Sequence, residues 1–168
     1  MKRNRITSAV LVCVLALLLA GCGQSVESKS AYVQHHAEEI AVNDVVQLLN
    51  LEGLKVDRME PSVDFAEQFP GVQICKINGD NVLLMKVVEG DATAALQELG
   101  WEDLQTIDME NPEAVVAQLM TDYAADEATY QTGTAYAAKN IAACYIAADD
   151  DTAAETVARV FDQHINGN

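Results

Sequence analysis

Two cysteines in apolar segments are the first candidates for chemistry. Cys75 lies within residues 72–77 and Cys144 within residues 141–146, both rich in Val, Ile and Ala. Two cysteines of an exported protein can form a disulfide, but buried free thiols that pack as small hydrophobic groups fit the same segments. The separation of the two Cα atoms decides between these alternatives, and both stay open here. No histidine or carboxylate stands beside either cysteine at ligand spacing, so we expect neither to be catalytic or to bind a metal.

A segment rich in histidine and glutamate is the second candidate. His35 and Glu39 are four residues apart, and His36 and Glu38 lie between them. On a helix this spacing would place the imidazole and the carboxylate on one face, where they could bind a borderline metal such as zinc. Two or three ligands from one segment make a weak metal site. The alternative is a solvated, polar start to the first helix.

Acidic residues gather in two further places. The run 149–151 offers three carboxylates to Ca²⁺ but lacks the alternating spacing of a calcium loop. The run also fits the start of a helix, where the helix dipole favours negative charge. A second acidic group surrounds Trp101, which follows Gly100 and can either close the core or serve as a platform for a ligand. This group comprises Glu102, Asp103, Asp108 and Glu110.

Groups that ordinary enzymes need are scarce after the first 21 residues. The sequence contains no Gly-x-Ser-x-Gly turn and no glycine-rich phosphate loop. Few histidines remain for a Ser-His or Cys-His pair, and few arginines remain to bind a phosphate or carboxylate substrate. The remaining histidines are His35, His36 and His164, and the remaining arginines are Arg58 and Arg159. We therefore expect a protein that is not an enzyme and that uses no cofactor.

The first 22 residues have the order of a secretory leader. Lys2, Arg3 and Arg5 precede an uncharged apolar segment, residues 6–20. A helix needs roughly 20 apolar residues to cross a bilayer, so this segment is too short to span one comfortably and has the proportions of a signal peptide. Small residues follow it, as a signal peptidase requires.

The end of this leader, Leu19-Ala20-Gly21-Cys22, resembles the lipobox of bacterial lipoproteins. The resemblance implies cleavage before Cys22 and attachment of lipid, including palmitate, to that cysteine. Two acyl chains suffice for stable anchoring, so the mature protein would be held on the extracytoplasmic face of the cell membrane. The alternatives are ordinary cleavage near Ala20, which would release the protein, and an uncleaved anchor helix.

Net charge limits the partners of the mature protein. The whole chain carries −16, and residues 1–21 hold three of its 10 basic residues and none of its 26 acidic ones, so the mature net charge is −19. Such a surface repels nucleic acid and anionic lipid headgroups. We therefore expect no nucleic-acid binding, and a domain that stands off the membrane rather than lying on it.

The chain divides into residues 1–21 as signal peptide, 22–30 as a flexible tether and 31–168 as one domain. The stretch from Gly23 to Ser30 is small and polar and would reach at most about 28 Å when extended. The 147 residues that remain after cleavage suffice for one domain with a real core.

Periodicity and turn signals predict the elements of this domain. The firmest is a hairpin of residues 72–77 and 82–88 around Asn78-Gly79, because both turn residues accept positive φ. Capping residues and glycine stops predict helices, and apolar or alternating runs predict further strands. The predicted helices are 32–51, 92–99, 111–123 and 152–165, and Asn43-Asp44 could cap a second segment that starts inside the first of them. The other predicted strands are 54–59 and 138–147, and residues 126–134 are predicted as a loop.

These elements predict an α+β fold, a two-layer sandwich with a four-stranded, mainly antiparallel sheet and helices on one face. The element order, together with residues 136–140 (Tyr-Ala-Ala-Lys-Asn) leading into an apolar strand, resembles small uncharacterised lipoproteins of Gram-positive bacteria. This resemblance carries no known catalytic residues.

Two functional hypotheses follow. In the first, the protein is a membrane-anchored extracytoplasmic lipoprotein that acts as a non-enzymatic interaction or accessory module, bound to the membrane through lipid on Cys22 and to a protein of the cell envelope. In the second, its acidic groups capture a cation or small ligand with low affinity.

Overall fold

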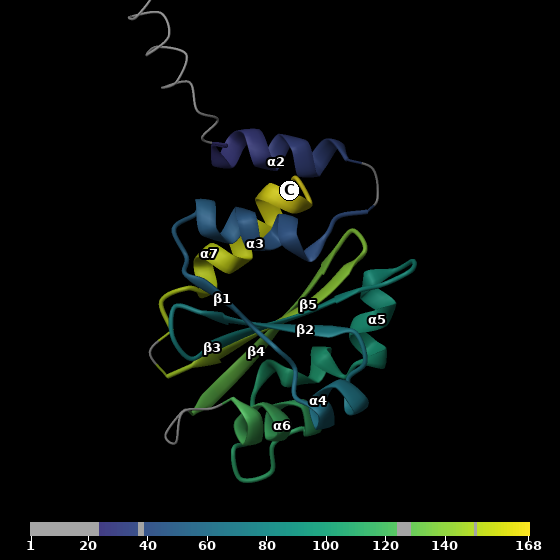
Figure 1. Cartoon of the computed structure of the whole chain (residues 1–168), viewed down its shortest axis with the longest axis vertical. Coiled ribbons are helices and arrows are strands. Elements are labelled where there is room, and N and C mark those ends of the chain that lie inside the picture. The colour runs from purple at the N-terminus through teal and green to yellow at the C-terminus, as the bar shows by residue number, and fades with distance from the viewer. Residues whose placement is uncertain (1–23, 37–38, 124–128, 150) are drawn as a thin grey trace, which may run out of the picture.

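The computed structural model describes residues 24–36, 39–123, 129–149 and 151–168 and has an α+β fold (Figure 1). One antiparallel sheet has the strand order β1-β2-β3-β5-β4. Its strands are β1 (Val56–Met59), β2 (Val72–Ile77), β3 (Asn81–Val87), β4 (Tyr130–Ala138) and β5 (Ile141–Ala148). The α-helices are α2 (Val26–His35), α3 (Val42–Leu51), α4 (Val63–Gln68), α5 (Ala92–Glu98), α6 (Ala114–Asp122) and α7 (Ala154–Arg159). A 3₁₀ helix, η1 (Trp101–Gln105), follows α5, and a π-helical turn, η2 (Val160–Ile165), extends α7.

The β2–β3 hairpin confirms the prediction made for Asn78-Gly79. Both residues have positive φ, 47° and 107°, and the strands pair from Val72↔Lys86 to Ile77↔Asn81. Two predicted helix boundaries with a local signal are confirmed, whereas the helices predicted from residues 111 and 152 begin later, at Ala114 and Ala154. Gly53 ends α3 with φ 88°, and Asp91 accepts a hydrogen bond from the N–H of Thr93 at the start of α5.

The sheet has five strands, so the prediction of four is wrong. Strand β4 occupies residues 130–138, of which 130–134 were predicted as loop. The polar composition suggested a loop, but Tyr130, Thr132 and Thr134 alternate there with Gln131 and Gly133, and the strand they begin pairs along the whole of β5. The last predicted strand, 138–147, is accordingly β5 alone, and a turn at 139–140 separates it from β4.

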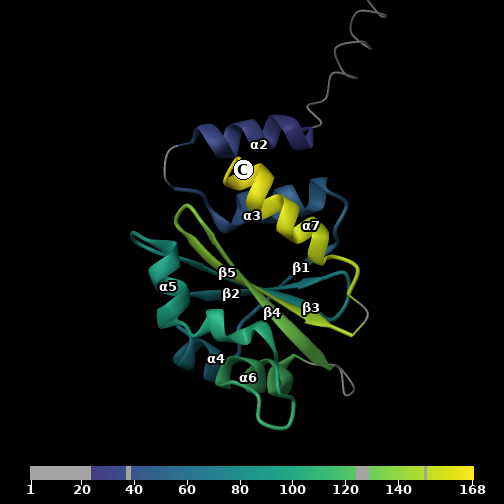
Figure 2. The same cartoon turned by 180° about the vertical axis from the view of Figure 1, so that it is seen from behind.

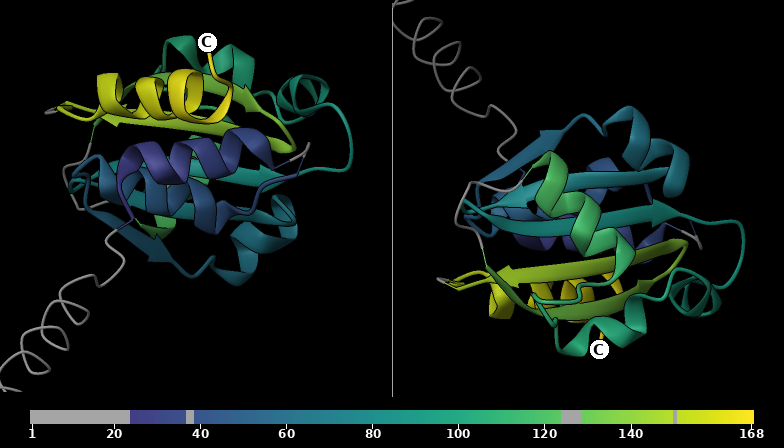
Figure 3. Two further views of the ribbon diagram at one scale, coloured as in Figure 1. Left: turned by 90° about the horizontal axis from the view of Figure 1, so that it is seen from above. Right: turned by 90° about the horizontal axis from the view of Figure 1, so that it is seen from below.

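Helices cover both faces of the sheet, so the prediction of helices on one face is also wrong (Figures 2 and 3). Helices α2, α3 and α7 with η2 lie on one side, and α4, α5, η1 and α6 lie on the other. The cause is the composition of the central strands. Leu83 and Met85 of β3 join the core of the first side, and Val82 and Leu84 join the core of the second. Strands that are apolar on both faces need cover on both faces to leave water.

The N-terminal segment differs from its prediction as well. The predicted helical stretch 32–51 is two helices, α2 and α3; the second begins at Val42, close to the cap predicted at Asn43-Asp44, whereas α2 begins inside the predicted tether 22–30. Ser25 caps α2 by accepting a hydrogen bond from the N–H of Ser28 (3.2 Å). Lys29 and Ser30 are buried because each finds a polar partner in the domain. These partners are distant in sequence, so local composition could not reveal them.

Candidate functional site

The residue with the strongest sequence prediction, Cys22, lies outside the described residues. Within the described ranges, no helix is long and apolar enough to cross a membrane.

His35 and Glu39 do not share a helix face, so that part of the metal prediction is wrong. Helix α2 ends at His35, the C-cap residue His36 is extended (φ −70°, ψ 117°), and Glu39 lies beyond the helix. The ammonium of Lys139 donates hydrogen bonds to Val33 O and to His36 O (2.8 Å). These bonds cap the C-terminal end of α2 and fix where the helix ends. In the described part of the chain, no group of three or more His, Cys, Asp or Glu residues is placed to hold a metal ion.

Cys75 and Cys144 are free, buried thiols on opposite faces of the sheet. Strand β3 lies between their strands, opposing Cys75 with Leu83 and Cys144 with Leu84. Two strand spacings separate β2 from β5, about 10 Å, which is too far for a disulfide. Burial raises the pKa of Cys75 to about 11, against a smaller lowering by Arg58, and raises that of Cys144 to about 12. Thiols protonated to this degree are poor nucleophiles.

The acidic groups have structural contacts. Asp151 accepts hydrogen bonds from the N–H groups of Ala153 (2.8 Å) and Ala154 (3.2 Å), which caps α7; Asp150 lies outside the described residues. Trp101 is fully buried in the core beneath η1, so it packs as a core residue. Glu102 and Asp103 lie in the first turn of η1.

Four hollows lie on the described surface, and neither Cys75, Cys144 nor His164 lines any of these four. The roomiest of them, about 640 Å³, runs along strand β4. Its floor is residues 132–135, and its wall is formed by Leu96 of α5 and by Glu102 and Gln105 of η1. This hollow, which we call the β4 groove, borders an edge of the sheet.

The β4–β5 hairpin determines which backbone groups of β4 face this groove. Ala138 pairs with Ile141 across the two-residue turn 139–140. The closing pair of such a hairpin exchanges both of its N–H···O bonds, and hydrogen-bonded pairs then alternate along the strands. The backbone groups of Tyr136 and Thr134 therefore face β5.

Backbone groups of the intervening residues, Gly133, Ala135 and Ala137, face away from the sheet. Two contacts from outside the sheet agree with this assignment. The N–H of Ile107 donates to Gln131 O (3.0 Å), and the side-chain amide of Asn166 donates to Ala137 O (3.2 Å).

Between these two contacts lies a stretch of edge that is open in its hydrogen bonding, although Gly133 is buried against η1 and Ala135 is half-buried. No described residue forms a hydrogen bond with the N–H or C=O of Gly133 or Ala135 beyond the strand pairing itself. A row of unpaired backbone donors and acceptors is a template on which another extended chain can pair.

Charge distinguishes this edge from the opposite one. Strand β1 carries Asp57 and Arg58 among its four residues, and the ammonium of Lys55 lies 2.7 Å from Asp57. Charged side chains of this kind protect a sheet edge from pairing. Strand β4 has nine residues and no charge among them.

Sequence reasoning missed this site because it assigned residues 130–134 to a loop; the alternating Tyr and Thr residues were the signal that could have revealed it.

Gly133 fixes the distance between the edge and the wall of the groove. A Cβ at this position would lie 2.6 Å from Leu104 Cβ and 2.9 Å from Leu104 O. The backbone of η1 therefore passes close beneath β4, and only glycine leaves room for it.

The sequence matches no protein-family model, and neither a curated protein nor a solved structure is significantly similar to it.

Proposed function

We propose that this protein is a lipid-anchored lipoprotein of the extracytoplasmic membrane face, and that its domain binds an extended segment of another envelope protein by strand addition at the β4 groove. The observation that carries the proposal is the uncharged edge at Gly133 and Ala135, whose outward backbone groups have no hydrogen-bond partner among the described residues. Strand addition of this kind uses main-chain hydrogen bonds for affinity and the neighbouring side chains for specificity. It requires no catalytic group.

Charge favours a basic or neutral segment as the occupant. Glu102 stands in the wall of the groove, and the mature protein carries −19 because the leader removes only basic residues. A second copy of the chain would bring the same negative charge to the interface, and like charges oppose association. A segment with Lys or Arg would instead gain from both the local carboxylate and the overall field.

Substituting proline at Ala135 tests the binding edge. The N–H of Ala135 faces outward, so Ala135→Pro removes a donor from the groove while leaving the pairing with β5 intact; proline is tolerated at such edge positions. Ala135→Ser is the matched control, because it changes the side chain and keeps the N–H.

Phage-displayed random peptides selected on the wild-type domain supply the ligand for this test. We expect the selected peptides to be enriched in Lys, Arg and β-branched residues, to bind Ala135→Ser normally and to lose binding to Ala135→Pro. Thermal unfolding verifies that both variants are folded. Peptides that bind Ala135→Pro as tightly as the wild type, or a selection that enriches no peptide, would refute binding at this edge.

Anchoring has its own test. The proposal rests on the lipobox-like residues 19–22 and predicts that a Cys22→Ala variant stays uncleaved by the lipoprotein peptidase and loses labelling by a palmitate analogue in bacteria. The wild-type protein should be labelled in the same culture conditions. If the variant is still labelled, Cys22 is not the lipidated residue and the anchor proposal fails.

A further inference from the structure

Helix α2 is the outermost element on its side of the molecule. It packs on α3 and η2, which in turn cover the sheet, and α6 lies at the opposite end (Figures 1 and 3). Val33 is the only apolar residue of α2 that is fully buried. A helix with so little apolar contact needs polar contacts to stay in place.

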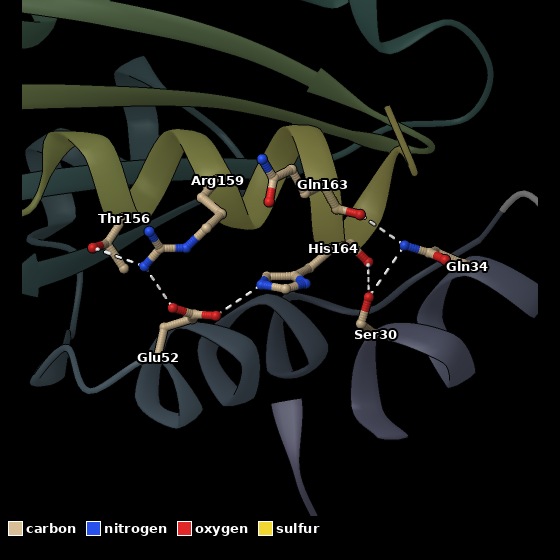
Figure 4. A network of polar contacts seen from close by, with 7 residues as sticks. All are labelled: Ser30, Gln34, Glu52, Thr156, Arg159, Gln163 and His164. Carbon is tan, nitrogen blue, oxygen red and sulfur yellow. Dashed lines mark hydrogen bonds and ion pairs between the residues drawn. The ribbon is translucent and has the colours of Figure 1, made fainter. Parts of the chain in front are cut away.

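Polar contacts hold the inner face of α2. The ammonium of Lys29, 5% exposed, lies 2.5 Å from a carboxylate oxygen of Asp44 in α3. Ser30 donates to the carbonyl of His164 (3.2 Å), and Gln34 donates to that of Gln163 (2.7 Å), both in η2 (Figure 4).

The C-terminal turn of α2 is fixed as well, by Lys139 at the β4–β5 turn. A cation at the last carbonyls of a helix also interacts favourably with the helix dipole. Contacts at both ends therefore fix the orientation of α2 on the domain.

The outer face of α2 has no partner among the described residues and carries little charge. Its exposed residues include Ser28, Ala31, Tyr32 and His35, and Glu27 is its one carboxylate. Tyr32 is 49% exposed, with its ring centroid 3.9 Å from that of His36 and 4.9 Å from the ammonium of Lys29. A half-exposed tyrosine with polar neighbours suits the membrane interface, where tyrosine is enriched.

Chain length places this face near the anchor. Three residues, Gly23 to Ser25, separate Cys22 from the first residue of α2, so the four Cα–Cα steps span at most about 14 Å. Each headgroup region of a bilayer is roughly 5–8 Å thick. A lipid on Cys22 would therefore hold the N-terminus of α2 at the headgroups.

We infer that the outer face of α2 rests on the bilayer surface that holds the lipid anchor, an inference that depends on the anchor part of the proposed function. The long tether predicted from sequence would let a domain of charge −19 stand away from anionic lipid, but α2 takes up residues 26–35 and removes that distance. With a short tether, the domain must turn one face to the membrane. The α2 face is the one adjacent to the anchor, and it presents a single carboxylate to the lipid phosphates.

Site-directed spin labels test the orientation. Ala31→Cys places a label on the outer face of α2, and Val63→Cys places one at the start of α4, on the other side of the sheet, where Val63 is 73% exposed. The native Cys75 and Cys144 are buried and should not react. Each full-length lipidated protein is extracted and reconstituted in vesicles of phosphatidylethanolamine and phosphatidylglycerol.

The accessibility of each label to a water-soluble nickel relaxant is then measured on the vesicles. The reference is the same labelled protein without lipid and without detergent, made as Cys22→Ala with the leader removed. We expect the label at 31 to lose accessibility severalfold on vesicles and the label at 63 to keep it. If the protein floats with vesicles and both labels stay equally accessible, the α2 inference is overturned while the anchor stands. If the protein does not float with vesicles, the anchor proposal fails and the inference fails with it.

Discussion

Adding one methyl group at Gly133 tests how closely η1 lies against strand β4. The added Cβ would lie 2.6 Å from Leu104 Cβ, whereas carbon atoms in favourable contact are about 3.5–4.0 Å apart. Leu104 O, 2.9 Å from the added Cβ, is a backbone atom, so a change of side-chain rotamer cannot relieve this contact. In Gly133→Ala, η1 must therefore move outward by about 1 Å.

Overpacking of this kind costs about 1–3 kcal/mol of unfolding free energy, which corresponds to a fall in Tm of about 2–12 °C for a domain of this size. Trp101 is the only tryptophan of the chain, is fully buried and begins η1. Its fluorescence reports the displacement directly, so we expect a red shift of the emission maximum in the folded variant. Urea and thermal unfolding give the loss of stability.

Thr134→Ala is the matched control, because it introduces alanine at the next position of the same strand, where the side chain is exposed. We expect its unfolding free energy to change by less than about 0.5 kcal/mol and its emission maximum to stay the same. If Gly133→Ala is as stable as the wild type and emits at the same wavelength, η1 does not lie against β4 as described, and the wall of the β4 groove is misplaced.

Two further predictions concern titrating groups. Burial alone would raise the pKa of Glu52, but hydrogen bonds from Arg159 (2.6 Å) and His164 (2.8 Å) outweigh it and lower that pKa (Figure 4). The stabilisation from a lowered carboxyl pKa is fully present above the unfolded value of 4.5 and is lost as the pH falls through the lower folded value. Glu52→Gln should therefore cost roughly 1–2 kcal/mol of unfolding free energy at pH 7, and in thermal unfolding the difference from wild type should shrink as the pH falls below 4.5. A difference that grows on acidification would contradict this assignment. Cys75 and Cys144 should not react with a disulfide reagent at pH 8 in the folded protein and should both react after denaturation without reductant; a mass two daltons low in the unreduced protein would instead reveal a disulfide.

Elements set by local signals were predictable from the sequence. The Asn78-Gly79 turn needs positive φ at adjacent residues, which few other pairs accept, so it fixed the β2–β3 hairpin. The stop at Gly53 and the cap at Asp91 are also local. Each of these features depends on residues within one turn of the chain, and the α+β class follows from them.

Features that depend on distant partners were not predictable. Strand β5 is apolar at every position, which indicates burial on both faces, but nothing within it shows that helices from the two ends of the chain cover one face and helices from its middle cover the other. The polar start of α2 resembles a tether until Asp44 and His164 are brought beside Lys29 and Ser30. The composition of a segment indicates how polar it is, but it does not show which distant residues the segment contacts in the folded protein.

The β4–β5 hairpin also connects the two proposals physically. Its turn residue Lys139 adopts φ 55° and donates to carbonyls at the C-terminal end of α2, while Gly133 and Ala135 of the same strand form the open edge. From Gly133 to Lys139 is six residues of strand, about 20 Å. The open edge is thus held at a fixed distance and direction from α2 by a continuous pair of strands rather than by a flexible loop. If α2 rests on the bilayer, a segment bound along β4 is presented in one orientation relative to the membrane, which a module on a long tether could not achieve.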